Sequence, residues 1–248
     1  MRKIILILFT VLSGQVKSQT AEEILDRYFI SVGTKEKWAQ INSRIDKIET
    51  VRVSDMLNHG KPLQTTKTEI TYKFSKRKDS IVWDRFVSVS IDSPGDTSSS
   101  CFNGTNYWTQ KSHKVANDFD YYANRYAKFA NVGHPDLLLR ADRYEFIGNK
   151  KIDENICNVI RITIEGLESD YYFDSETNYL VMYHQKGKDL QTKLSDYRNV
   201  DGLMIPFKED LTNNNGFVSS NRTVEIKINP FIEDMYFSKQ IGLGLLIK

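Results

Sequence analysis

Residues 157–174 read CNVIRITIEGLESDYYFD, two runs of β-branched and aromatic residues that break at Glu165-Gly166. Such runs, separated by a turn signal, predict two neighbouring antiparallel strands. The same pattern continues toward Pro230 in further short apolar runs, with turn residues such as Asp201-Gly202 between them. We therefore expect an antiparallel meander over residues 157–230, with one apolar face that must be covered or filled.

The region upstream, residues 45–108, also has the pattern of strands. Between Thr66 and Phe74 the even-numbered positions form one face and the odd-numbered positions, most of them charged, form the other. The next strand is expected to place its apolar residues on one face, with Arg85 in the same parity: Ile81, Trp83, Val87, Val89 and Ile91.

Helical spacing occurs near the N-terminus and in the middle of the chain. Thr20 and Glu23 form a capping box, an apolar stripe from Ile24 to Val32 follows, and Gly33 ends the helix. Residues 35–41 predict a second short helix. Residues 118–130 predict a helical insertion, followed by another turn from Asp136. Helices segregated from a curved antiparallel sheet give an α+β fold.

Residues 1–18 have the character of a signal peptide. Arg2-Lys3 precedes the short apolar run 4–12, and small residues place the cleavage after Ser18. We expect one domain, 19–248, in an exported, soluble, periplasmic protein. Removing 1–18 leaves 31 basic against 32 acidic side chains. This near balance gives no electrostatic argument for nucleic-acid binding.

The chain carries no catalytic or metal-binding motif of a familiar kind. Its four histidines have neither HxH nor HxxxH spacing, and it has no phosphate-binding or dinucleotide-binding loop. Cys101 and Cys157 lack a CxxC context; in an exported protein they could form a disulfide or remain buried free thiols. We therefore predict no metal, no cofactor and no catalytic residue.

Several short segments carry a resemblance to a known family. They are SVGTKEKW at 31–38, residues 144–148 with Lys151-Ile152-Asp153, YYFD at 171–174, and Asp196-Tyr197-Arg198 with DGLMIP at 201–206. Together they resemble the LolA-like periplasmic lipoprotein carriers, in particular the outer-membrane lipoprotein-sorting proteins. The resemblance implies a half-open β-barrel with helices covering its concave face, where acyl chains are held. It also implies inner- and outer-membrane transport partners.

From these patterns we expect a lipid carrier that acts as a monomer. The predicted lining of the apolar cavity is Tyr72, Phe74, Trp83, Ile162, Met182, Phe207 and Ile226. The predicted lid residues are Tyr28, Phe29, Tyr122 and Tyr126, and Arg85 is the predicted polar anchor. Any lining residue could instead be an ordinary core residue. Two alternative functions remain: a non-catalytic sensor or protein-interaction module of the envelope, and an envelope hydrolase.

Overall fold

The structure is a computed structural model. It describes residues 19–52, 64–77, 80–92, 95–103, 107–111, 135–138, 141–164, 166–214 and 216–238. The predicted lid residues Tyr122 and Tyr126, and the predicted helical insertion at 118–130, lie outside these ranges. So does the expected signal peptide.

α1 (Ala21–Val32) begins and ends where the sequence indicates, whereas α2 (Lys35–Trp38) ends at Trp38, earlier than the predicted helix over 35–41. α1 has the predicted capping box, in which the Thr20 and Glu23 side chains each accept from the other's backbone N–H, and Gly33 is its left-handed C-cap. α2 follows directly, and α4 (Pro135–Leu138) is a single turn near the predicted start at Asp136. The chain's described part closes with the 3₁₀ helix η1 (Asp234–Phe237).

The strands form one antiparallel sheet of 12 strands in the order β5-β4-β3-β2-β1-β12-β11-β10-β9-β8-β7-β6. Their bounds are β1 (Ser43–Arg52), β2 (Gln64–Arg77), β3 (Ser80–Asp92), β4 (Thr97–Phe102), β5 (Tyr107–Lys111), β6 (Arg143–Ile152), β7 (Asn155–Ile164), β8 (Leu167–Asp174), β9 (Leu180–Gln185), β10 (Gln191–Val200), β11 (Leu203–Asn213) and β12 (Gly216–Ile228). The predicted meander of residues 157–230 is confirmed as β7–β12.

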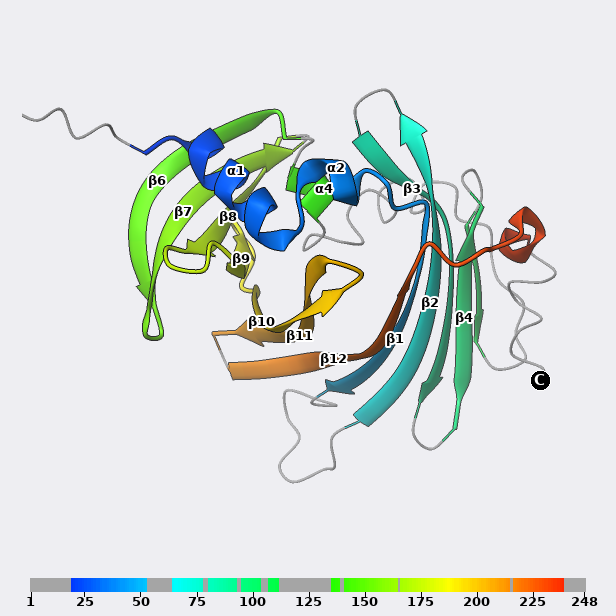
Figure 1. The fold of residues 1–248 in the computed structure, drawn as a ribbon. Coiled ribbons are helices and arrows are strands. Elements are labelled where there is room, and N and C mark those ends of the chain that lie inside the picture. Colours follow the sequence, from blue (N-terminus) through cyan, green and yellow to red (C-terminus); the bar gives the residue numbers. More distant parts are fainter. Residues whose placement is uncertain are drawn as a thin grey trace, which may run out of the picture.

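The sheet curls without closing. β5 and β6 are its two edges, and among the described residues no pairing joins them. Figure 1 shows the sheet bending around a concave side, on which α1, α2 and α4 lie. The predicted covering of the whole concave face also involves residues 118–130, which are outside the described part of the chain. We call the concave side the inner face and the convex side the outer face.

Alternation along each strand assigns residues to these faces. Tyr171 and Phe173 of β8 are buried in the main core, which includes the apolar stripe of α1. Tyr172, between them, belongs to a separate cluster with Cys157, Val159 and Met182. The main core therefore lies on the inner face, and the Tyr172 cluster lies on the outer face.

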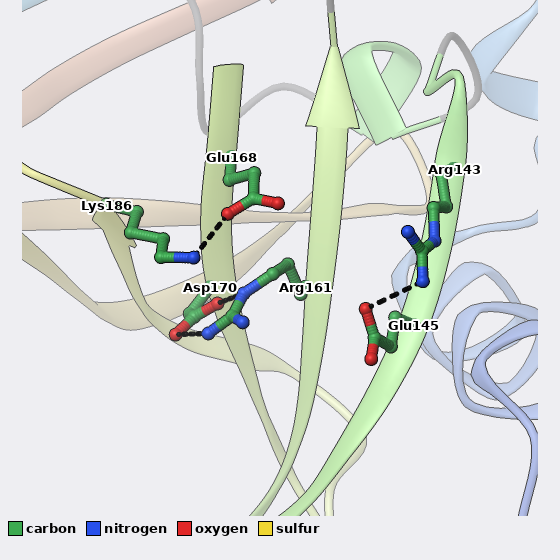
Figure 2. Close-up of polar contacts among 6 residues, drawn as sticks. All are labelled: Arg143, Glu145, Arg161, Glu168, Asp170 and Lys186. Atoms are coloured by element: carbon green, nitrogen blue, oxygen red, sulfur yellow. Dashed lines mark hydrogen bonds and ion pairs between the residues drawn. The ribbon is translucent and has the colours of Figure 1, made fainter. Parts of the chain in front are cut away.

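A belt of charged side chains also lies on the outer face of β6–β9. Arg161 of β7 makes a bidentate ion pair with Asp170, its partner on β8, at 2.8 and 3.0 Å. Arg143 pairs with Glu145, and Lys186 with Glu168, on either side of it (Figure 2). With three cations and three carboxylates, this belt is balanced in charge, and we interpret it as an ordinary solvated surface.

The two cysteines are buried free thiols, not the disulfide considered above. Cys157 lies in the Tyr172 cluster, whereas Cys101 of β4 lies in a second outer cluster with Val87 and Phe237. Burial raises the pKa of Cys101 to about 12 and that of Cys157 to about 11. Both therefore stay protonated and unreactive at neutral pH.

The predicted apolar face of β3 is wrong. The register of β2 against β3 shifts between Lys73 and Phe74, so that Trp83 pairs with Phe74 while Arg85 pairs with Lys73. This irregularity breaks the period-2 alternation on which the prediction relied. From Arg85 onward the odd-numbered residues lie on the outer face, where Val87 is buried against Phe237. Phe86 packs toward the inner face instead.

Gly33 lies where the end of α1 meets the sheet. Its φ is +115°, and an added Cβ would lie 2.8 Å from the Gly202 carbonyl oxygen, just before β11. Gly148 has nearly the same φ, +112°, with no heavy atom of the described residues within 4 Å of that position. Positive φ costs any alanine about 1–2 kcal/mol, but Gly33→Ala adds a steric clash.

We expect Gly33→Ala to lower the free energy of unfolding by at least about 1 kcal/mol more than the control Gly148→Ala. Urea denaturation of both variants measures this difference. Equal losses would show that α1 does not end against the turn before β11.

Candidate functional site

The inner face divides into two parts, and α1 fills one of them. The apolar stripe of α1 packs against inner residues of β7–β11, among them Ile160, Phe173 and Ile205. Tyr28 meets the Phe173 ring edge-on, with 5.1 Å between the ring centroids. Tyr28 and Phe29 are each 2% exposed. The two predicted lid residues of α1 are thus core residues of this half, and a movable lid remains a prediction.

The second part of the inner face, formed by β12, β1, β2, β3 and β4, is less deeply buried. Its inner residues lie in cross-strand rows, because directly paired residues share a face. The aromatic row consists of Ile228, Arg44, Tyr72, Phe86 and Phe102. The next, mixed row consists of Ile226, Asp46, Ile70, Ser88 and Ser100.

Two further rows are polar, and we call them the hydroxyl rows. The first consists of Thr223, Ile48, Thr68, Ser90 and Ser98. The second consists of Glu209, Asn221, Thr50, Thr66 and Asp92. The inner face of this half therefore changes from aromatic to hydroxyl-bearing along the strands.

Hydrogen bonds run along the hydroxyl rows from strand to strand. The Thr68 and Ser90 hydroxyls lie 2.9 Å apart, and Thr66 Oγ1 donates to Asp92 at 2.5 Å. Thr50 Oγ1 donates to the Asn221 side chain at 2.8 Å. Thr66, Thr68 and Ser90 are half-buried, so they are still accessible to a ligand or to water.

Charged residues lie in the rows where the inner face changes from aromatic to hydroxyl-bearing. Arg44 Nε donates to Asp46 Oδ1 at 2.6 Å, with side chains only 12% and 8% exposed. Burial raises the pKa of the Glu209 carboxyl; a hydrogen bond with Asn221 and the charge of Arg44 oppose this shift, and Asp46 adds to it. The site thus contains one paired cation and more than one carboxylate.

No pattern in the sequence indicated these charged residues. In β1, Arg44 and Asp46 alternate with Ile45, which ordinarily indicates that the isoleucine faces the core. The structure has the reverse arrangement, because Ile45 lies on the outer face with Phe231 and Ile232. The prediction of Arg85 as an inner polar anchor fails in the same way, since Arg85 pairs with Asp234 of η1 at 2.9 Å, on the outer face.

The predicted lining residues fall into different places. Tyr72, Phe74, Ile162 and Phe207 are buried in the main core, and Ile226 is half-buried against it. Met182 belongs to the outer Tyr172 cluster and so does not share their face; the register of β8 against β9 shifts beside it. The backbone of Trp83 lies opposite Phe74 in the β2–β3 pairing. The side chain of Trp83 is outside the described part of the chain. Binding by any of these residues remains a prediction.

Three pockets bounded by described residues lie over the outer face. One, of about 390 Å³, is lined by Val89, Ile91, Val224 and Tyr236 together with residues 47–49 of β1 and 67–69 of β2. Because these β1 and β2 residues are consecutive, the backbone of both strands contributes to its floor. Another, of about 440 Å³, lies between β1 and residues 231–236. A polar pocket of about 570 Å³ lies over β10–β12.

Metal-ligating clusters and membrane-spanning helices are both absent from the described ranges. Within them, no group of three or more His, Cys, Asp or Glu side chains could hold a metal ion. The helices of that part of the chain include none with the length and apolar character needed to cross a membrane.

The effect of Glu209 on stability tests whether its carboxyl is buried in the second hydroxyl row. Because its pKa is raised in the folded state, folding retains a proton that the unfolded chain releases. The group therefore costs no stability below its ordinary pKa, and the cost grows as the pH rises from that value to the raised pKa. Glu209→Gln should increase Tm by about 2–4 °C at pH 7.5 and change it little at pH 4.

Thermal denaturation followed by circular dichroism measures both values. Glu225→Gln is the control, because Lys47 lowers the pKa of Glu225 on the exposed outer face, so its loss should not increase Tm at pH 7.5. A Glu209→Gln effect of equal size at both pH values would contradict the assigned burial of this carboxyl.

Comparison with known proteins bears on the fold. No protein-family model and no curated protein matches the chain. Among solved structures, a DUF1329 family protein from Desulfovibrio piger is 11% identical, with a TM-score of 0.62. A putative outer membrane lipoprotein-sorting protein domain from Vibrio parahaemolyticus is 12% identical, with a TM-score of 0.57. A LolA superfamily protein from Nitrosomonas europaea is 12% identical, with a TM-score of 0.55. Each match covers 90% of this chain and 99% of the other. The chain therefore has a LolA-like fold.

Proposed function

We propose that this protein is an exported carrier that binds the acyl chains of lipoproteins or other lipids on its inner face, for sorting to the outer membrane. In this proposal residues 1–18 are a cleaved signal peptide and residues 19–248 form a single periplasmic domain. The observation that carries the proposal is a set of half-buried apolar side chains in the aromatic and mixed rows, beside the buried Tyr72 and Phe102, in a sheet that curls without closing: Ile70, Phe86, Ile226 and Ile228.

Apolar burial supplies enough free energy for this function. A twelve-carbon chain gains on the order of 10 kcal/mol when it leaves water, at about 0.8 kcal/mol for each methylene. Loss of translational and rotational freedom offsets much of that gain. Micromolar binding needs about 8 kcal/mol, which the two or three acyl chains of a lipoprotein supply after this offset, while release to a transport partner in either membrane stays possible.

The half of the sheet filled by α1 has a structural part in this mechanism. Its buried contacts pack α1 against β7–β11, which leaves the inner face of β12 and β1–β4 to a ligand. Binding of this kind needs no catalytic group and no cofactor. A monomer is sufficient, because one curved sheet supplies the whole surface.

A fluorescent fatty acyl probe tests the carrier function. We expect the purified protein to bind it at micromolar concentration or below. Ile226→Asp places a charge on the inner mixed row and should weaken binding at least about tenfold, since an unpaired charge against an acyl chain is costly.

The matched control is Val224→Asp, two residues away on the same strand. Val224 is 55% exposed and lines the outer pocket, so this variant should bind the probe as the unmodified protein does. Circular dichroism melts establish that both variants fold. Equal weakening by both, or no probe binding by the unmodified protein, would refute the carrier function.

A second candidate function is protein interaction through the outer face. The pocket of about 390 Å³ contains Ile91 and Val224, which are 51% and 55% exposed. An exposed apolar pocket rimmed by charges is typical of an interaction surface. The same pair of variants separates the functions, because Val224→Asp would then disturb partner binding while leaving probe binding intact.

A further inference from the structure

We propose that the ligand of the inner face is a lipid with an uncharged, hydroxyl-rich head group, such as a glycolipid or an acylglycerol. The inference rests on the proposed carrier function and names its cargo class. The acyl chain would lie over the aromatic and mixed rows, and the head group over the hydroxyl rows.

The dimensions of the inner face suit such a molecule. The rows succeed one another every two residues along a strand, from Arg44 in the aromatic row to Thr50 in the second hydroxyl row. At about 3.3 Å per residue, this stretch of β1 spans roughly 20 Å. This length accommodates a sugar-sized head group together with the first part of an acyl chain.

The side chains of the hydroxyl rows match a polyol in hydrogen-bonding character. A serine or threonine hydroxyl has one donor and two acceptor lone pairs. The contact between Thr68 and Ser90 uses one donor and one lone pair, so the pair retains a donor and several acceptors. Ser98 of β4 pairs with Ser90 of β3 and extends this half-buried surface. Sugar and glycerol hydroxyls both donate and accept, as such a surface requires.

The charges of the four rows disfavour an anionic head group. Arg44, their cation, is already paired with Asp46. Glu209 and Asp92 lie in the second hydroxyl row. A phosphate or carboxylate placed there would meet carboxylates in a partly buried site, where repulsion is stronger than in bulk water. An uncharged head group avoids this repulsion and keeps the hydrogen bonds.

Displacement of the fluorescent acyl probe by three amphiphiles of equal chain length tests the proposal. They are dodecyl maltoside, dodecyl phosphate and laurate, each kept below its micellar concentration at pH 7.5. We expect dodecyl maltoside to displace the probe at about tenfold lower concentration than either anion, the effect of one or two net hydrogen bonds.

A double variant, Thr68→Val with Ser90→Ala, removes a pair of inner hydroxyls at nearly constant volume. It should abolish the preference for maltoside while changing displacement by laurate less than about twofold. Thr65→Val is the control, because Thr65 pairs with Val51 on the outer face of the same strand and should leave all three displacements unchanged.

The outcomes separate the two proposals. If the probe binds but the anions displace it as well as or better than maltoside, the head-group assignment is overturned and the carrier function stands. The head-group assignment is likewise overturned, and the carrier function stands, if the double variant still prefers dodecyl maltoside over the two anions. If the probe does not bind at all, the carrier function fails, and the head-group assignment fails with it.

Discussion

The pairing of β1 with β12 is the interaction on which the rest of the structure depends. It joins the strands nearest to the two ends of the described chain, and thereby converts two separate meanders into one sheet of 12 strands. The polar rows cross this seam, since Thr50 of β1 hydrogen-bonds Asn221 of β12. Without the seam neither the curvature of the whole sheet nor the continuous inner rows could exist.

The two parts of the inner face have different physical characters. Where α1 packs, large apolar side chains are fully buried, as expected of a core that fixes the shape of a domain. Over β12 and β1–β4, many of the residues are half-buried, and the rows change from aromatic to hydroxyl-bearing along the strands. The LolA-like sheet of this chain therefore carries an amphipathic surface, on which the proposed amphiphilic ligand would lie.

Local patterns in the sequence predicted much of the fold. The capping box at Thr20, the C-cap at Gly33 and the meander of residues 157–230 depend on neighbouring residues, and all are confirmed. The sites were harder to predict because a single register shift reverses the faces of a strand. The shift beside Lys73 accompanies the placement of Arg85 on the outer face, and another beside Met182 accompanies its separation from the main core. No local pattern in the sequence marks such a shift.

The location of the bound acyl chain tests the central claim most directly. In methyl-resolved NMR of the protein with a lauroyl lipid added, intermolecular NOEs report which methyl groups touch the acyl chain. If the chain binds on the inner face, NOEs from it to Ile70, Ile226 and Ile228 are expected, and none to Ile91 and Val224 on the outer face. NOEs to Ile91 and Val224, with none to the inner methyl groups, would contradict the proposed location of the acyl chain.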